Sequence, residues 1–471
     1  MNRLTLTLCM TLLLISTAVA QQTAPGQLDG SWNGTLQAGG NKITIVFNFS
    51  STESGQLTAT MDIPMQGVKG MAIPEATLTQ DSLYLRIPSG GIEYAGKRTG
   101  PESIDGHWKQ SGMAFPLALA KGEAAEVRRP QTPAKPYPYQ EQEVTVENTA
   151  AGITLAGTLT IPEGKGKHPA VILFTGSGAQ DRDMTLLGHK PFLVLADHLT
   201  RQGFAVLRLD DRGAGKSGGN ASMATTQDFT SDAQAAYTFL KAHQSVNPKK
   251  VGLLGISEGA LIASSVAAAN KDVAFVVLLA GSAMPGVELL VQQNEALYKK
   301  GGIPEETLQK LLKLRRAQFE TAASEADVYA ASQKIRALEQ EAKASMTEQE
   351  IQQLQLGPEA ENAIVAQLSL PWARHFLAYD PAPTLRQLKM PVLALNGSKD
   401  LQVPATANLA ATEKALKAAG NKRYTIKELP GLNHIFQTAD TGLPGEYATI
   451  EETMAPVALE TISNWMKGVV K

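Results

Sequence analysis

From residue 144 onward, short continuous apolar runs alternate with segments of helical spacing, and this rhythm most constrains what the chain can fold into. A predicted antiparallel hairpin over 144–161 is followed by six apolar runs: 170–174, 205–209, 251–256, 273–280, 392–395 and 424–429. A strand that is apolar along its whole length must be covered on both faces, so these runs predict a mostly parallel sheet between helices, in a catalytic domain of residues 143–471.

The rhythm breaks after the run at 273–280. Residues 285–383 are rich in Glu, Lys, Gln, Ala and Leu and show helical spacing with no strand signal. We predict that this segment is a helical cap inserted into the sheet domain.

Residues 25–125 follow the period of two that is typical of strands with one buried face. Residues 43–49, for example, alternate apolar and polar side chains. Asp29-Gly30-Ser31-Trp32 is echoed by Asp105-Gly106-His107-Trp108 at the other end of this region. We predict a small β-barrel or sandwich with both Trp side chains in or near its core, joined to the catalytic domain by a Pro-rich linker, 126–142.

The first twenty residues have the pattern of a secretion signal. Arg3 precedes an apolar run that ends in Ala18-Val19-Ala20, the small-x-small pattern that signal peptidases cleave. The run is shorter than the ~20 apolar residues of a membrane-spanning helix. We therefore expect a signal peptide at 1–20, cleavage near Ala20, and export to the periplasm or the extracellular space. Cys9, the only cysteine, lies inside this segment, so the exported chain would carry no disulfide.

Length and charge bound the remaining possibilities. A chain of 471 residues is too long for one ordinary domain. The net charge of −2 offers no basic excess for nucleic acid, and no later apolar stretch is long enough to span a membrane. A small molecule is the expected partner, and these features do not indicate an oligomeric state.

Gly255-Ile256-Ser257-Glu258-Gly259 is the motif that carries the chemistry. It directly follows an apolar strand and directly precedes a helix of small residues, 260–269. In this strand–turn–helix context the pattern is a nucleophile elbow, in which large side chains at the two glycines would clash and the serine backbone is strained. The Ser257 hydroxyl would project at a helix N-terminus, where the dipole favours developing negative charge.

A serine hydroxyl needs a base, and the base needs a carboxylate to orient it. His434 lies in a loop after the last predicted strand, and Asp400 follows the strand at 392–395. The chain order Ser257, Asp400, His434 is the order that this arrangement requires. His189 is the one other histidine in a suitable position and remains an alternative base.

An oxyanion hole should supply two backbone N–H donors. Glu258, the residue after the nucleophile, provides one. The other is expected in the loop after the strand ending at 174, at Ser177 with Gly176 or Gly178 as alternatives; Asp181-Arg182-Asp183 would brace this loop by ion pairing. A second glycine turn, 211–218, lacks phosphate-loop spacing and is interpreted as a structural turn at the rim of the site.

These motifs together resemble the α/β-hydrolase superfamily and, within it, the EstD-type bacterial carboxylesterases. The resemblance covers about 144–471 and rests on the following segments: 176–183, 210–217, 255–259, 397–404 and Pro371-Trp372-Ala373-Arg374-His375-Phe376. It implies the α/β-hydrolase fold and the nucleophile, acid and base at Ser257, Asp400 and His434. Thr175 departs from the His that often opens the oxyanion loop of the family.

Three functions are compatible with this pattern. The first is a carboxylesterase that forms an acyl-enzyme on Ser257 and uses no metal or cofactor. The second is a peptidase of the related serine aminopeptidase type, which would need an acidic pair to hold a substrate amine. The third is a non-catalytic carbohydrate- or lipid-binding protein on the same fold, which would be favoured if a triad residue were missing.

Overall fold

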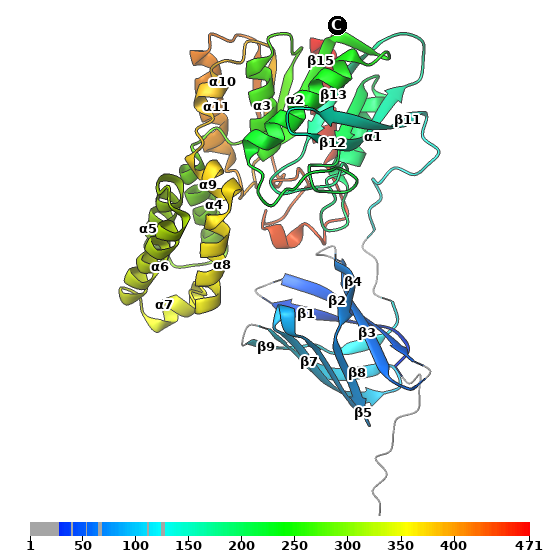
Figure 1. Cartoon of the computed structure of the whole chain (residues 1–471), viewed down its shortest axis with the longest axis vertical. Helices are drawn as coiled ribbons and strands as arrows, with labels where there is room; N and C mark the ends of the chain where they lie inside the picture. The colour runs from blue at the N-terminus through cyan, green and yellow to red at the C-terminus, as the bar shows by residue number, and fades with distance from the viewer. Residues whose placement is uncertain (1–27, 39–40, 53, 65–67, 111–112, 124–127) are drawn as a thin grey trace, which may run out of the picture. The chain divides into compact units, whose positions relative to one another are not determined.

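The computed structural model describes residues 28–471 except 39–40, 53, 65–67, 111–112 and 124–127. The predicted signal peptide, with Cys9 and the cleavage point near Ala20, lies outside the described residues. The chain divides into two compact units, Met1–Ala125 and Glu126–Lys471 (Figure 1).

The first unit is an antiparallel β structure. Its strands are β1 (Gly30–Ala38), β2 (Asn41–Ser51), β3 (Leu57–Ile63), β4 (Val68–Ile73), β5 (Glu75–Thr79), β6 (Ser82–Ile87), β7 (Ile92–Gly100), β8 (Ser103–Gln110), β9 (Met113–Pro116) and β10 (Leu119–Lys121), with a short 3-10 helix at Pro88–Gly90. The strand order is β4-β3-β2-β1-β10-β8-β7-β6-β5, and β9 pairs with β8. Because β4 and β5 end this order yet are separated in the chain only by Pro74, the sheet must roll round on itself.

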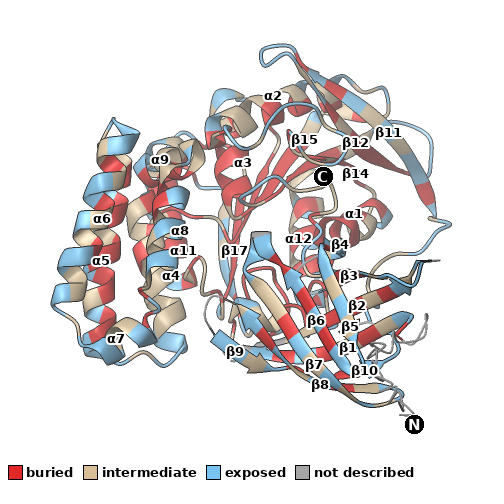
Figure 2. Ribbon diagram, turned by 60° about the horizontal axis from the view of Figure 1, so that its bottom comes forward, coloured by how far each residue is buried: buried red, intermediate tan, exposed pale blue. Residues whose placement is uncertain are grey.

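The rolled sheet encloses an apolar core. Buried and exposed side chains alternate along β6 (Figure 2), as a strand with one buried face requires. Trp32 and Trp108 are both buried, and the Trp32 indole donates a hydrogen bond to the Leu28 carbonyl (2.8 Å). The two Trp side chains therefore lie in the core, as the repeated motif predicts.

The second unit is built on an eight-stranded sheet. Its strands are β11 (Tyr139–Asn148), β12 (Ile153–Pro162), β13 (His168–Phe174), β14 (Ala205–Leu209), β15 (Val246–Ile256), β16 (Val276–Leu279), β17 (Val392–Gly397) and β18 (Tyr424–Leu429). Their order is β11-β12-β14-β13-β15-β16-β17-β18. The β11–β12 and β12–β14 pairs are antiparallel and every later pair is parallel.

Helices cover both faces of this sheet. They are α1 (Pro191–Arg201), α2 (Thr226–Ala242), α3 (Glu258–Ala269), α10 (Ala382–Leu385), α11 (Ala405–Ala418) and α12 (Pro456–Val469), with a 3-10 helix at Pro444–Glu446. Ala170 and Ile172 of β13 pack with α2, α3, α10 and α11, whereas Val171 and Leu173 pack with α1 and α12. This alternation within one strand explains why the strands are apolar at every position.

Of the seven helices between β16 and β17, six precede α10 and form an insertion. They are α4 (Gly286–Lys300), α5 (Glu305–Ser324), α6 (Val328–Ala344), α7 (Glu348–Gln353), α8 (Pro358–Ser369) and α9 (Pro371–Ala378). We call residues 286–378 the helical insertion. Figure 1 shows α4–α8 gathered into one bundle, which has apolar cores of its own. No helix among the described residues is long and apolar enough to cross a membrane.

The Pro-rich segment does not behave as a free linker along its whole length. The Arg129 guanidinium donates to the carbonyls of Leu187 (2.8 Å), Ala448 (2.7 Å) and Ile450 (2.8 Å). Gln131 donates to the Met454 carbonyl (2.7 Å). The described residues from 128 onward therefore belong with the catalytic unit, whose sheet begins at Tyr139 and not at the predicted boundary of 143. Proline content predicts stiffness but not the side chains that anchor the segment.

This anchoring predicts where the chain can be cut. Residues 128–471 should fold alone, whereas residues 141–471 should be less stable because they lack Arg129 and Gln131. Arg129→Met in the full chain should lower the free energy of unfolding of the catalytic unit by about 1–3 kcal/mol, because three carbonyls lose their donor. Arg128→Met, at an exposed neighbour, is the matched control. Equal denaturant midpoints for the two variants would contradict the assignment.

Candidate active site

Ser257 occupies a strained turn between β15 and α3. Its backbone angles are φ 55° and ψ −120°, a region that costs a non-glycine residue about 1–3 kcal/mol. The two flanking glycines make the turn possible. A Cβ on Gly255 would lie 1.9 Å from the Gly259 carbonyl oxygen, and a Cβ on Gly259 would lie 2.2 Å from the Phe174 carbonyl oxygen. The predicted elbow is thus present as a structural feature.

His434 and Asp400 form a buried pair. The His434 Nδ1 lies 2.9 Å from Asp400 Oδ2. Asp400 Oδ1 accepts from the backbone N–H groups of Gln402 and Val403, both at 2.9 Å, and Oδ2 also accepts from Asn396 Nδ2 at 3.2 Å. This pairing favours the tautomer in which Nδ1 of His434 donates to the carboxylate, and in the neutral imidazole Nε2 is then the nitrogen that can accept a proton.

The structure brings Ser257 and His434 to one cavity. Both line a cavity of about 530 Å³, together with the glycine-rich loop after β13. The contacts of the described residues include no hydrogen bond between Ser257 Oγ and His434. Such a bond is often long in a protein without substrate and shortens when the substrate binds.

His189, the alternative base, lies elsewhere. Its side chain is fully buried, Nδ1 contacts Thr453 Oγ1 and Nε2 contacts the Tyr447 carbonyl, both at 2.9 Å. Burial lowers the pKa of His189 to about 4. With both ring nitrogens engaged, His189 is a structural residue that ties the segment before α1 to the segment before α12.

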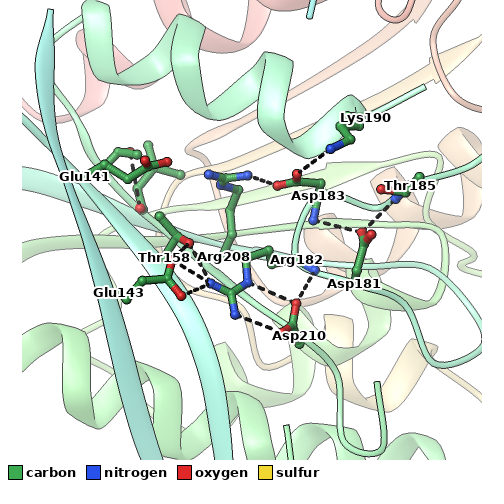
Figure 3. Close-up of polar contacts among 12 residues, drawn as sticks. Glu141, Glu143, Thr158, Asp181, Arg182, Asp183, Thr185, Lys190, Arg208 and Asp210 are labelled. Atoms are coloured by element: carbon green, nitrogen blue, oxygen red, sulfur yellow. Dashed lines mark hydrogen bonds and ion pairs between the residues drawn. The ribbon is translucent and has the colours of Figure 1, made fainter. Parts of the chain in front are cut away.

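The loop after β13 is held by ion pairs, as Figure 3 shows. Arg182 pairs with Asp210 (2.8 Å) and Glu143 (2.9 Å), and Asp183 pairs with Arg208, which is almost fully buried on β14. Hydrogen bonding to Asp210 raises the pKa of Arg182, so the pair is ionised. These contacts fix the backbone at 176–178. All three residues line the cavity of about 530 Å³ that contains Ser257 and His434, which we call the catalytic cavity.

Asp211, in the second glycine turn, supports the same loop from behind. Its Oδ2 accepts from Thr175 Oγ1 (2.7 Å) and from the Gln180 backbone N–H (3.0 Å). Burial raises the pKa of Asp211 to about 7, with a smaller contribution from Glu258. Thr175, at the position where the family often has His, therefore donates its hydroxyl hydrogen bond to Asp211 just after β14. The turn at 211–218 supports the loop structurally.

The side chain of Glu258 links the Ser257 turn to two helices. Its side chain is buried, and Oε1 accepts from Thr226 Oγ1 of α2 (2.6 Å) and from Trp372 Nε1 of α9 (2.8 Å). The residue after Ser257 is thereby tied to the helical insertion. The motif that contains Trp372 can be recognised in the sequence, but nothing in the sequence predicts that Trp372 contacts Glu258.

Four side chains of the insertion line the catalytic cavity: Leu289, Gln293, Trp372 and Phe376. The Trp372 and Phe376 rings stack with centroids 5.2 Å apart. Within the described part of the chain, no group of three or more His, Cys, Asp or Glu side chains is arranged to hold a metal ion. The arrangement can activate a serine hydroxyl, bind an oxyanion and enclose an apolar substrate.

The strand order and the serine elbow define the α/β-hydrolase class. Within it, residues 190–438 match the family model described as "Serine aminopeptidase, S33". Because this match spans more than half of the chain, the chain belongs to this family of hydrolases, and the predicted fold and family resemblance are confirmed.

Curated relatives are similar over part of the chain. Esterase EstD of Thermotoga maritima is 33% identical over 186 residues, which are 39% of this chain and 43% of that protein. An uncharacterized protein of Pseudomonas aeruginosa is 30% identical over 141 residues, 29% of this chain and 36% of its own. The polyketide transferase claH of Penicillium crustosum is 31% identical over 134 residues, 27% of this chain and 41% of its own. The chain thus spans less than half the length of each of these relatives.

Solved structures are also similar. An esterase of Pyrococcus furiosus aligns with a TM-score of 0.43 at 14% identity, covering 74% of this chain and 100% of that one. Est1E from Butyrivibrio proteoclasticus, with ferulic acid bound, aligns with a TM-score of 0.42 at 16% identity, covering 69% and 99%.

The lowered pKa of His189 predicts that the stability of the fold depends on pH. In the unfolded chain this side chain should titrate near pH 6.5, above its folded pKa of about 4. The unfolded state then binds more protons between these values, so stability is lost as the pH falls from about 6.5 to 4. His189→Gln should be less stable than the wild type at pH 7 but should show a shallower loss over that window in urea unfolding, and should retain hydrolase turnover. An unchanged slope, or an inactive but folded variant, would contradict this role.

Proposed function

We propose that this hydrolase cleaves carboxylic esters through an acyl-enzyme on Ser257, with His434 as base and Asp400 as the orienting acid. The observation that carries the proposal is the strained Ser257 elbow opening onto the same cavity as a histidine whose Nδ1 is held by a buried carboxylate. The similarity to one relative, Esterase EstD, supports the choice of bond.

The proposed mechanism follows from these positions. His434 Nε2 takes the proton of Ser257 as its Oγ attacks the ester carbonyl, and Asp400 stabilises the charged imidazole. The backbone N–H groups of Glu258 and Ser177 bind the resulting oxyanion at the N-terminus of α3. His434 then protonates the leaving alcohol, and water activated by His434 releases the acid. No step requires a metal or an organic cofactor.

We assign the helical insertion the role of a cap. Its Leu289, Gln293, Trp372 and Phe376 side chains wall the catalytic cavity, so they limit the size of the groups around the scissile bond. This enclosure favours small or slender esters over polymeric ones.

Two alternatives fit the cavity less well. A serine aminopeptidase would hold a substrate amine with an acidic pair, but among the described residues that line the cavity Asp181 alone carries a carboxylate. Its Oδ1 already accepts from the backbone N–H groups of Asp183 (3.1 Å) and Thr185 (2.9 Å). A non-catalytic binding protein would not need the strain at Ser257 or the polar contacts around Asp400.

We also propose that the protein is exported, on the basis of Arg3, the apolar run and Ala18-Val19-Ala20. The exported form should begin at Gln21 and contain no thiol. Intact-mass measurement of protein from the periplasm or medium checks this, and retention of Met1 or a lipid adduct would contradict it.

The proposed triad predicts the following losses. Ser257→Ala should remove nearly all turnover, by about a thousandfold or more, and abolish labelling by a fluorophosphonate probe, because the nucleophile is gone. Asp400→Asn should lower kcat by a similar factor, because an amide at that position no longer enforces the Nδ1–H tautomer. Circular dichroism should show both variants folded. Turnover within tenfold of the wild type in a purified Ser257→Ala variant would remove Ser257 from the mechanism.

The bond that is cleaved can be tested on the wild type alone. Matched 4-nitrophenyl esters and aminoacyl 4-nitroanilides with the same acyl group should give a much higher kcat/KM for the ester. A free α-amino group should bring no gain, since no acidic pair lines the cavity among the described residues. A preference for aminoacyl anilides would favour the aminopeptidase alternative instead.

A further inference from the structure

A second cavity, of about 190 Å³, lies within the helical insertion. It shares three wall residues with the catalytic cavity: Gln293 of α4 and Trp372 and Phe376 of α9. The two cavities therefore adjoin each other at these residues, where the Trp372 and Phe376 rings stack. A substrate held at Ser257 could extend along these rings into the second cavity.

One charged side chain lines this second cavity. Arg315 of α5 is the only charged residue among the described residues that line it, and its exposed fraction is 9%. Its Nη1 donates to Gln318 Oε1 (2.8 Å). No carboxylate of the described residues lies within ion-pair distance of Arg315, whereas its neighbour Arg316 pairs with Glu288.

The surroundings of Arg315 leave its charge uncompensated. Gln318 is fully buried and donates from Nε2 to Glu339 Oε2 (3.4 Å), so an amide separates the guanidinium from that carboxylate. Glu339 is itself paired with Lys343 (2.9 Å). The second cavity therefore keeps an excess positive charge. The hydrogen bond to Gln318 fixes one side of the Arg315 guanidinium that carries this charge.

A buried cation without a counter-ion is costly, and a ligand carboxylate would relieve that cost. A guanidinium matches a carboxylate with two parallel N–H donors, which makes the pair stronger than a neutral hydrogen bond. The other polar groups on the wall, Gln293, Asn294 and Gln367, are uncharged amides. The site thus combines one cation with an apolar and aromatic approach.

We propose that Arg315 binds a free carboxylate of the substrate, so that the preferred substrates are monoesters of dicarboxylic acids or similar esters that carry a second, anionic end. In this arrangement the ester carbonyl lies at Ser257 and the linking carbons lie against Trp372 and Phe376. The inference rests on the proposed ester hydrolysis and adds the chemical class of the substrate.

The first test uses the unmodified protein. Mono-4-nitrophenyl esters of linear dicarboxylic acids of increasing length are compared with neutral esters in which the free carboxylate is replaced by its methyl ester. At one chain length the charged ester should have the higher kcat/KM, by about tenfold or more, as expected for a hydrogen-bonded charge pair. A preference for the neutral partner at every length would overturn the proposal.

Variants locate the preference. Arg315→Gln should bring the charged-to-neutral ratio of kcat/KM close to one, and Arg315→Lys should retain part of it as a point charge. Arg316→Gln, which removes a half-buried cation one position along the same helix that is paired with Glu288, should leave the ratio unchanged. A ratio that is equal in the wild type and Arg315→Gln, or that falls equally in Arg316→Gln, would show that Arg315 is not the binding residue.

A binding measurement separates this proposal from the proposed function. Calorimetry with Ser257→Ala and the free dicarboxylate of the preferred length should detect binding, and Ser257→Ala combined with Arg315→Gln should lose it. Arg315-dependent binding in Ser257→Ala, together with a wild-type protein that cleaves no ester, would support the anion site and overturn the ester hydrolase assignment. Ester hydrolysis without any Arg315-dependent preference or binding would overturn the anion site and leave the ester hydrolase assignment standing.

Discussion

The close approach of β15, α3 and β13 around two glycines is the constraint on which the rest of the catalytic unit depends. A Cβ at Gly255 would collide with the Gly259 backbone, and one at Gly259 with the end of β13. Only this packing allows the chain to turn within one residue and leaves Ser257 with φ 55°. The strain is offset by the hydrogen bond from the Ser257 backbone N–H to the Leu279 carbonyl (2.8 Å) and by the buried cores on both faces of the sheet.

Three sets of polar contacts fix the residues around this turn. The Arg182–Asp210 pair fixes the loop after β13, the backbone amides of 402–403 fix Asp400, and Trp372 reaches Glu258 from the insertion. The last contact joins α9 of the helical insertion directly to the residue that follows Ser257. The position of the insertion and the geometry of the Ser257 turn therefore depend on one another.

The sequence was sufficient where a local pattern has one structural solution. Continuous apolar runs predicted the sheet, and the glycines around Ser257 predicted the elbow, because both follow from short-range sterics and burial. It was not sufficient where a partner lies far along the chain. The contact between Glu258 and Trp372 spans 114 residues, and the anchoring of Arg129 on Ile450 spans 321. The unpaired state of Arg315 likewise depends on which helices of the insertion face one another, and helical periodicity does not determine this.

The anchoring of Arg129 and Gln131 on the strip 448–454 has a topological consequence. The chain enters this unit beside the segment that leads into its final helix, α12. Residues more than 300 positions apart in the sequence are thereby held together. The entry segment and the strip 448–454 should therefore loosen or stay ordered as one piece of the fold, although neither belongs to a helix or strand of the sheet domain.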